Sequence, residues 1–304
     1  LYGSDALGGV LYIQPEKFAP ENTTKFNVNQ RYFSNTLGSN TSLGVKSSLN
    51  NWQFLARGTY AIHSDYKTPN QRVTNTRFKE KDLKLGVGFH EKNFSSELRY
   101  NFNNSRLGLT EGIGEQTKET HLEIPYQDIN NHIISLHNHV FFKNSKLDID
   151  LGYTINNRKE FEEHEEHEDG ETEEEHEEHE EGEAALSMKL KTFSYNAKYH
   201  FPKMNKFEIL IGTQGLHQTN TNFGEELLIP NAKINDFGVF TTANFELNDN
   251  TRLQGGIRFD NRSIRTERHA VQHAYGVHIF HAIDNSFPSF SASFGFTTNF
   301  FSVL

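Results

Sequence analysis

Residues 251–261 read TRLQGGIRFDN, and their apolar and polar side chains alternate one by one. One face of this segment carries apolar or small residues, namely Leu253, Gly255, Ile257 and Phe259. The opposite face carries mostly polar residues, namely Arg252, Gln254, Gly256, Arg258 and Asp260. A period of two predicts a β-strand whose two sides meet unlike surroundings.

The same alternation recurs along the whole chain and predicts about twelve strands. They lie near residues 25–35, 40–49, 52–64, 82–90, 93–106, 131–142, 146–159, 187–201, 206–221, 235–247, 251–264 and 288–300. Strands of soluble proteins average roughly 5–6 residues. A tilted strand that spans a bilayer needs about 9–11. The length of the predicted strands therefore favours a membrane protein.

The connections between these strands alternate between short and long. Short polar turns lie at residues 50–51, 91–93, 143–145, 202–205 and 248–250, and longer loops at 65–81, 107–130, 160–186, 222–234 and 265–287. The first connection on the loop side, near 36–39, is also short. Barrels with tight periplasmic turns and long outer loops have this pattern. We therefore expect an all-β fold, a transmembrane antiparallel β-barrel. The alternatives are a soluble β-sandwich or solenoid, neither of which demands the alternation.

Composition agrees with a barrel. Only 35% of the 304 residues are hydrophobic and no stretch suits a transmembrane helix, but a barrel strand needs an apolar residue only at every second position. The absence of Cys excludes disulfides and thiolate metal sites. Residues 160–183 hold 16 acids and no Lys or Arg, so the rest of the chain has 24 acids against 30 bases. The net charge of -10 is therefore local, and this acidic segment argues against a nucleic-acid partner.

Strand polarity also predicts which side chains face lipid and which face the lumen. The outer-membrane lipid is expected to contact Trp52, Phe54, Tyr60, Ile62, Phe193, Tyr195, Tyr199 and Phe201. The lumen is expected to contain Lys46, Gln53, Arg57, Glu97, Arg99, Arg252, Gln254 and Arg258. So many charges exclude a dry interior, because unpaired charge is costly in apolar surroundings. The lumen must hold water or a polar plug.

Residues 1–13, LYGSDALGGVLYI, do not fit the strand pattern. They resemble the closing segment of the plug domain in TonB-dependent outer-membrane receptors. Residues 255–260 (GGIRFD), residues 287–293 (FPSFSAS) and Ile229-Pro230 ahead of residues 236–240 are similar to barrel segments of that family. The resemblance implies that residues 1–20 are the C-terminal end of a plug and that residues 21–304 belong to the barrel.

This resemblance also implies a larger protein. Family members have a folded plug inside 22 strands, so about 12 strands are expected to be a fragment. The alternative is a native twelve-strand barrel. The implied location is the outer membrane of a Gram-negative bacterium, and the implied assembly is a monomer. A TonB-type energy-transducing protein is expected to bind through a region N-terminal to this sequence.

A duplicated motif carries the clearest chemical signal. Residues 162–168 and 174–180 both read EEHEEHE. The candidate metal ligands are His164, His167, His176 and His179, with Glu163, Glu166, Glu175 and Glu178. Imidazole and carboxylate together suit zinc, with copper, nickel and cobalt close behind. The segment resembles the His-rich or acid-rich loops of zinc-uptake receptors. The alternative is a solvated acidic run without a ligand.

Two further groups of histidines are candidates for a secondary metal or substrate path. His137 and His139 alternate with Ser135 on the predicted lumen face, where they are either cargo contacts or wall residues hydrogen-bonded to the plug. His269, His273, His278 and His281 fall in the predicted outer loop 265–287, as part of a site above the plug or as ordinary loop polarity.

The sequence thus predicts a receptor for energy-coupled uptake of a divalent metal ion, zinc before others. One alternative is a receptor for a siderophore, haem or another metal chelate, with the acidic loop incidental. Another is a non-transport role, such as an adhesin or a structural porin. No catalytic constellation supports an enzyme, and no cofactor is required beyond the bound or transported metal.

Overall fold

The computed structural model describes residues 13–110, 112, 114–162, 184–224, 227–273 and 276–299, with backbone alone for 271–273 and 276–278. Within these residues the chain is all-β. Its strands are β1 (Thr24–Phe33), β2 (Gly38–Leu49), β3 (Trp52–His63), β4 (Phe78–Glu91), β5 (Phe94–Gly108), β6 (Tyr126–Phe141), β7 (Lys146–Phe161), β8 (Leu186–His200), β9 (Phe207–Asn222), β10 (Ala232–Asn248), β11 (Thr251–Thr266), β12 (His269–His273), β13 (Gly276–Phe280) and β14 (Asp284–Thr298).

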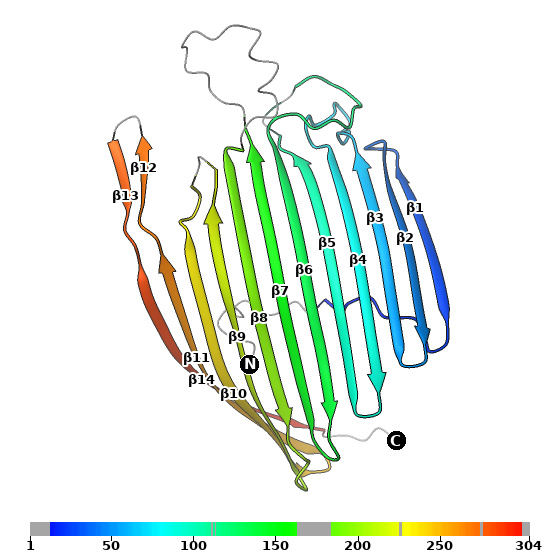
Figure 1. Ribbon diagram of the computed structural model, residues 1–304, viewed down its shortest axis with the longest axis vertical. Helices are drawn as coiled ribbons and strands as arrows, with labels where there is room; N and C mark the ends of the chain where they lie inside the picture. Colours follow the sequence, from blue (N-terminus) through cyan, green and yellow to red (C-terminus); the bar gives the residue numbers. More distant parts are fainter. Residues whose placement is uncertain are drawn as a thin grey trace.

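Twelve of these strands form one antiparallel sheet in the order β1 to β11 and then β14. Strands β1 to β11 each pair with the next strand in sequence, β11 pairs with β14, and the sheet curves as one wall of a barrel (Figure 1). All twelve strands predicted from the alternation are present, and most are 14 to 17 residues long. The prediction of a transmembrane antiparallel β-barrel fold is confirmed.

The sequence prediction was wrong about residues 265–287, which were expected to form one outer loop. Strand β11 continues to Thr266, and β12 and β13 pair as a separate two-stranded sheet. Each of these strands has only 5 residues, which is too short for an alternation to stand out. The four histidines in the segment made it resemble a polar loop.

The long described connections lie at one end of the sheet, together with the short β1–β2 turn, and the other short turns lie at the opposite end. The turns that join β2 to β3, β4 to β5, β6 to β7, β8 to β9 and β10 to β11 lie at one end, at the bottom of Figure 1. Asn50 and Asn205 occupy the left-handed backbone region there, with φ of 50° and 54°. Asn tolerates this conformation better than other non-glycine residues. The long described connections lie at the other end (Figure 1).

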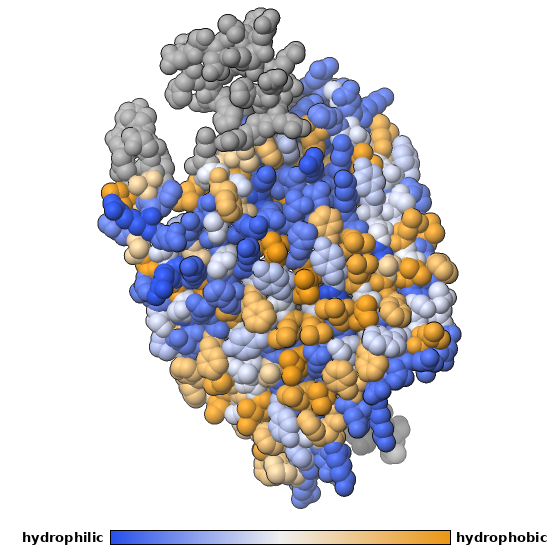
Figure 2. Space-filling model, viewed as in Figure 1, coloured by the Kyte–Doolittle hydropathy of each residue, from blue (hydrophilic) through white to orange (hydrophobic). Residues whose placement is uncertain are grey.

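The two faces of the sheet have opposite polarity. Large apolar side chains point outward and stay exposed, among them Phe54 (47%), Leu98 (49%) and Ile257 (50%). Figure 2 shows apolar side chains gathered below a hydrophilic band at the loop end. In the described part of the chain the buried apolar residues are few: Ala19, Leu55, Ala61, Ala185, Leu186 and Phe240. The apolar surface therefore faces the surroundings of the sheet instead of an internal core, as lipid contact requires.

No helix in the described residues is long and apolar enough to cross a membrane.

Candidate functional site

Inward side chains form a polar row across the concave face of the sheet. Register places Glu97 opposite His137, His137 opposite Asp150, and Asp150 opposite Asn196. The row continues through Gln214 and Gly238 to Asp260. Since cross-strand partners point to the same face, hydrogen-bonding side chains line one height of the wall, interrupted at Gly238.

Histidine and aspartate meet on strands β6, β7 and β8. His137 Nδ1 lies 2.9 Å from Asp150 Oδ1, and Asn196 Nδ2 donates to Asp150 Oδ2 at 3.2 Å. Two residues further along β6 and β7, on the same face, the oxygens of Asp148 accept hydrogen bonds from His139 Nδ1 at 2.6 Å and from His200 Nε2 at 2.8 Å. A carboxylate on one ring nitrogen fixes the ring and leaves the other nitrogen for a ligand.

Arginine and aspartate meet at the other end of the row. Arg258 is 3% exposed, and its Nε donates to Asp260 Oδ2 at 2.6 Å. Gly238 makes room for this pair, because a Cβ there would lie 2.4 Å from Asp260 Oδ1. Arg258 Nη1 and Asn196 Oδ1 are buried without a hydrogen-bond partner among the described residues. Such atoms are costly unless a further polar group meets them.

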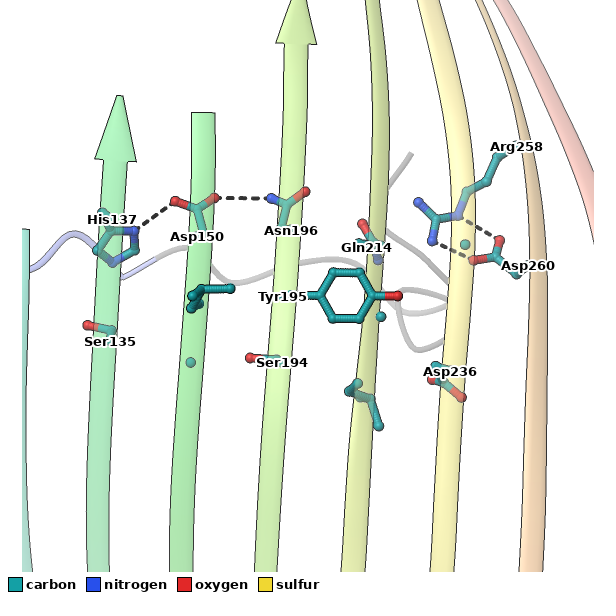
Figure 3. Close-up of a pocket in the computed structure, with 15 residues that line it drawn as sticks. Ser135, His137, Asp150, Ser194, Tyr195, Asn196, Gln214, Asp236, Arg258 and Asp260 are labelled. Carbon is teal, nitrogen blue, oxygen red and sulfur yellow. Dashed lines mark hydrogen bonds and ion pairs between the residues drawn. The ribbon is translucent and has the colours of Figure 1, made fainter. Parts of the chain in front are cut away.

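Two adjoining cavities open on this row. The first has a volume of about 420 Å³ and is lined by the row from His137 to Asp260 (Figure 3). The second has a volume of about 780 Å³ and lies between the wall and residues 13–19. His137 and Asp150 line both cavities. The His–Asp pair thus stands where the two cavities meet.

Residues 13–20 cross the inner face of the neighbouring strands and are called the N-terminal strap. Glu16 accepts two hydrogen bonds from Arg57, at 2.9 and 2.8 Å, and lies 3.0 Å from Lys46 Nζ. The hydrogen bonds from Arg57, together with Lys46, lower the pKa of Glu16 to about 2. The Phe18 ring lies 4.4 Å from the Arg99 guanidinium carbon. The strap is therefore fixed to the wall by charge and by packing.

The long connections above these strands are also tied together. Arg77 is fully buried and donates to Asp65, with Nη2 to Oδ2 at 2.7 Å, and to Glu123 at 3.1 Å. The hydrogen bond to Asp65 raises the pKa of Arg77 above its ordinary value. Asn75 Nδ2 reaches three backbone oxygens of the 109–125 connection at 2.7 to 3.0 Å. We call this group the loop clamp.

Comparison with known proteins bears on the fold. No protein-family model matches the sequence, and no curated protein matches it. Solved structures do match. The ferric citrate transporter FecA in its unliganded form has a TM-score of 0.69 at 12% identity, over 99% of this chain and 45% of that chain. The FrpB iron transporter from Neisseria meningitidis has a TM-score of 0.66 at 15% identity, over 90% of this chain and 44% of that chain. The copper transporter OprC has a TM-score of 0.65 at 12% identity, over 93% of this chain and 43% of that chain.

This chain shares its β-barrel fold with these three transporter structures. Identities of 12 to 15% show a shared fold alone. The chain spans less than half the length of each of these three structures.

The predicted site residues fall into three groups. The duplicated motif, with His164, His167, His176 and His179 and the glutamates Glu163, Glu166, Glu175 and Glu178, lies outside the described residues. His137 and His139 point into the lumen, each against an aspartate. His269, His273 and His278 belong to the β12–β13 hairpin and His281 follows it. Among described residues no group of three or more His, Asp or Glu is arranged to hold a metal ion.

The sequence prediction missed the partners of the two lumen histidines. Asp148 and Asp150 share a face of the segment 146–156, and the short turn at 143–145 brings this strand back along the one that holds His137 and His139. Counting outward from that turn places each aspartate within one residue of its histidine. His200 and Asn196 needed the register of a second strand pair, across the long connection 162–185, which no short turn fixes.

Proposed function

We propose that this chain is part of a TonB-dependent receptor in the outer membrane of a Gram-negative bacterium, which takes up a metal ion or a metal chelate. The observation that carries the proposal is the polar row with its His–Asp pairs, open to two cavities on the inner wall of a receptor-type barrel. The strap is proposed to be the exit of a plug domain, because it lies inside the wall and leads into β1.

Zinc is the cargo we propose. The duplicated EEHEEHE motif lies in the connection from β7 to β8, and the inner faces of these strands carry Asp148, Asp150 and His200. The acidic motif would concentrate cations near the barrel mouth. Neutral imidazole would select zinc over calcium and magnesium. The ion would then pass to the free ring nitrogens of the wall histidines.

A metal chelate is the second candidate, and one observation favours it. Arg258 Nη1 is buried without a partner in the described residues, and Lys198 and Arg99 line the second cavity. Cationic donors of this kind recognise carboxylate or phenolate oxygens of an anionic chelate. The name ferric citrate transporter assigns such a cargo to one structure of the same fold.

Uptake of radioactive zinc by cells that express the complete reading frame tests the cargo. The test variant replaces His164, His167, His176 and His179 with Gln. The matched control replaces Glu171, Glu173, Glu181 and Glu183 with Gln, which removes four charges and keeps both copies of the motif. We expect the histidine variant to lose about tenfold of its uptake at limiting zinc, and the control to keep most of it. Equal uptake by wild type and the histidine variant would contradict zinc capture by this motif.

The receptor class has its own test. Uptake should stop when the TonB-type partner is deleted or when an uncoupler collapses the proton gradient. Uptake that continues in both cases would indicate a passive pore instead. Growth on a ferric chelate that requires the complete protein, together with zinc uptake that does not, would support the second candidate.

A further inference from the structure

Basic side chains form a row on the outer face of strands β8 to β11. Register places Lys191 opposite Thr219, Thr219 opposite Lys233, and Lys233 opposite Arg265. The inward neighbour of Lys191 is Thr192, which is bound by Gln218 within the lumen wall, so Lys191 itself points outward. We call Lys189, Lys191, Lys233 and Arg265 the outer basic row, since Lys189 lies two residues above Lys191 on the same face.

Positive charge in this row is not neutralised within the wall. Lys189, Lys191 and Lys233 form no ion pair with any described residue. Arg265 is paired with Asp284 at 2.7 Å. Between the lysines the outer face carries Thr219 and Thr221 of β9, which are uncharged. Three lysines are therefore available to an anion that approaches from outside the barrel.

The row lies at the upper border of the apolar belt. Phe193 is the next outward residue after Lys191 on β8 and is 43% exposed. On β10, Asn235 separates Lys233 from Phe237, which is 49% exposed. In Figure 2 hydrophilic residues replace apolar ones toward this loop end. Charged side chains at the lipid-facing midplane of a barrel are costly but are tolerated near the interfaces. The lysines thus lie at the height where lipid head groups begin.

A groove lies below the row, on strands β9, β10, β11 and β14. It has a volume of about 300 Å³ and is lined on the outer face by Ile211, Val239, Thr241, Ile257, Phe259 and Phe290. Val239 is six residues from Lys233, or about 20 Å along a strand. A molecule with phosphates at the basic row and acyl chains directed down the belt would contact both features.

We propose that the outer basic row binds the phosphate groups of a phosphorylated glycolipid of the outer leaflet, of the lipopolysaccharide class, whose acyl chains occupy the groove. The proposal rests on the outer-membrane location given under Proposed function. Phosphate is matched by lysine as a compact point charge, and Thr219 and Thr221 add hydroxyl donors between the lysines.

The acidic segment 163–183 is the competing occupant, because it joins β7 to β8. The row extends away from the strand that this segment precedes. Lys191 lies five residues into β8 from Leu186, about 17 Å along the strand. Lys233 is on β10, with the whole of β9 in between. A lipid beside the wall reaches all three lysines directly.

Lipid binding by the complete protein, purified in detergent, tests the proposal. The probes are bis-phosphorylated lipopolysaccharide, the same lipid after removal of its phosphates, and phosphatidylglycerol. The test variant is Lys189→Gln with Lys191→Gln and Lys233→Gln. The matched control is Lys92→Gln with Lys143→Gln and Lys206→Gln, three exposed lysines at the short-turn end. Native mass spectrometry gives the affinity of each.

We expect the test variant to bind phosphorylated lipopolysaccharide about 100-fold more weakly, at about fivefold for each lysine, and the control to bind like wild type. Dephosphorylated lipid should bind wild type as weakly as intact lipid binds the variant, and added salt should weaken wild-type binding.

Equal affinity of the test and control variants for phosphorylated lipopolysaccharide overturns the proposal. So does wild-type binding to phosphatidylglycerol with the same affinity as to phosphorylated lipopolysaccharide. Binding that occurs only after deletion of residues 163–183 also overturns it and assigns the lysines to the acidic segment. Since no transport is measured, failure of metal uptake would leave this result unaffected.

Discussion

The wall has two halves that use charge differently. In the half built by β2 to β5, inward charges hold other parts of the same chain: Arg57 and Lys46 hold the strap, and the loop clamp ties the connections above. In the half built by β6 to β11, inward charges pair only along the wall in the described residues, as His137 does with Asp150 and Arg258 with Asp260. The first half is closed by the chain itself, and the second is open.

The difference indicates where a cargo would bind. A guanidinium that already holds a carboxylate of the strap is desolvated and saturated, so it offers little to a ligand. The open half keeps the unpartnered Nη1 of Arg258 beside the first cavity, and the second ring nitrogens of His137 and His139 beside the second cavity. The closed half therefore serves as the anchor of the structure, and the open half as the contact surface for cargo.

The largest expected effect follows from removing the buried ion pair of the loop clamp in the closed half. Arg77→Leu leaves Asp65, which is 1% exposed, without its cation. Loss of one partner from a buried pair costs about 3 to 5 kcal/mol. Urea unfolding of the complete protein in lipid vesicles measures this loss, and Arg77→Lys should restore part of it. Stability within about 1 kcal/mol of wild type would show that the clamp does not hold the closed half.

A second substitution breaks the open half without unfolding it. Asp150→Asn keeps the shape of the side chain but removes the charge that orients His137. We expect metal uptake to fall by about 10- to 100-fold, the usual loss when the carboxylate behind a metal-binding imidazole is changed. The matched control is Asp82→Asn, an inward carboxylate of the closed half that accepts from Asn103 at 2.8 Å. Equal losses in both variants would erase the distinction between the halves.

The strap gives a pH-dependent prediction. The pKa of Glu16 is about 2, against an ordinary 4.5, so its ion pairs stabilise the folded state fully above pH 4.5 and are lost as the pH falls toward 2. Glu16→Gln should therefore cost about 1 to 2 kcal/mol at pH 7, allowing for solvent screening, and almost nothing near pH 2. Unfolding of both proteins at pH 7 and pH 2 measures the change. A difference that stays constant across this range would contradict anchoring by the Glu16 carboxylate.

Much of this arrangement could be predicted from sequence, but unequally for the two halves. Alternation located all twelve wall strands and placed His137 and Arg258 in the lumen, because period-two patterning is local. The aspartates beside the histidines required register, which only the short turn at 143–145 supplies. The strap contact between Glu16 and Arg57 joins residues 41 positions apart, and no periodicity encodes such a contact. The loop clamp also joins residues far apart in the sequence, such as Arg77 and Glu123, so the closed half was less predictable than the open half.

The smallest expected effect tests whether burial is what makes an ion pair of the closed half strong. Arg106 lies on the outer face above this half, is 54% exposed, and donates to Asp128 at 2.8 Å. Asn104 also donates to that carboxylate, at 2.7 Å, so Arg106→Leu leaves Asp128 a partner. We expect a loss below about 1 kcal/mol, as for exposed ion pairs in general. This substitution matches Arg77→Leu in residue type, so equal losses in urea unfolding would mean that burial does not set the strength of the clamp.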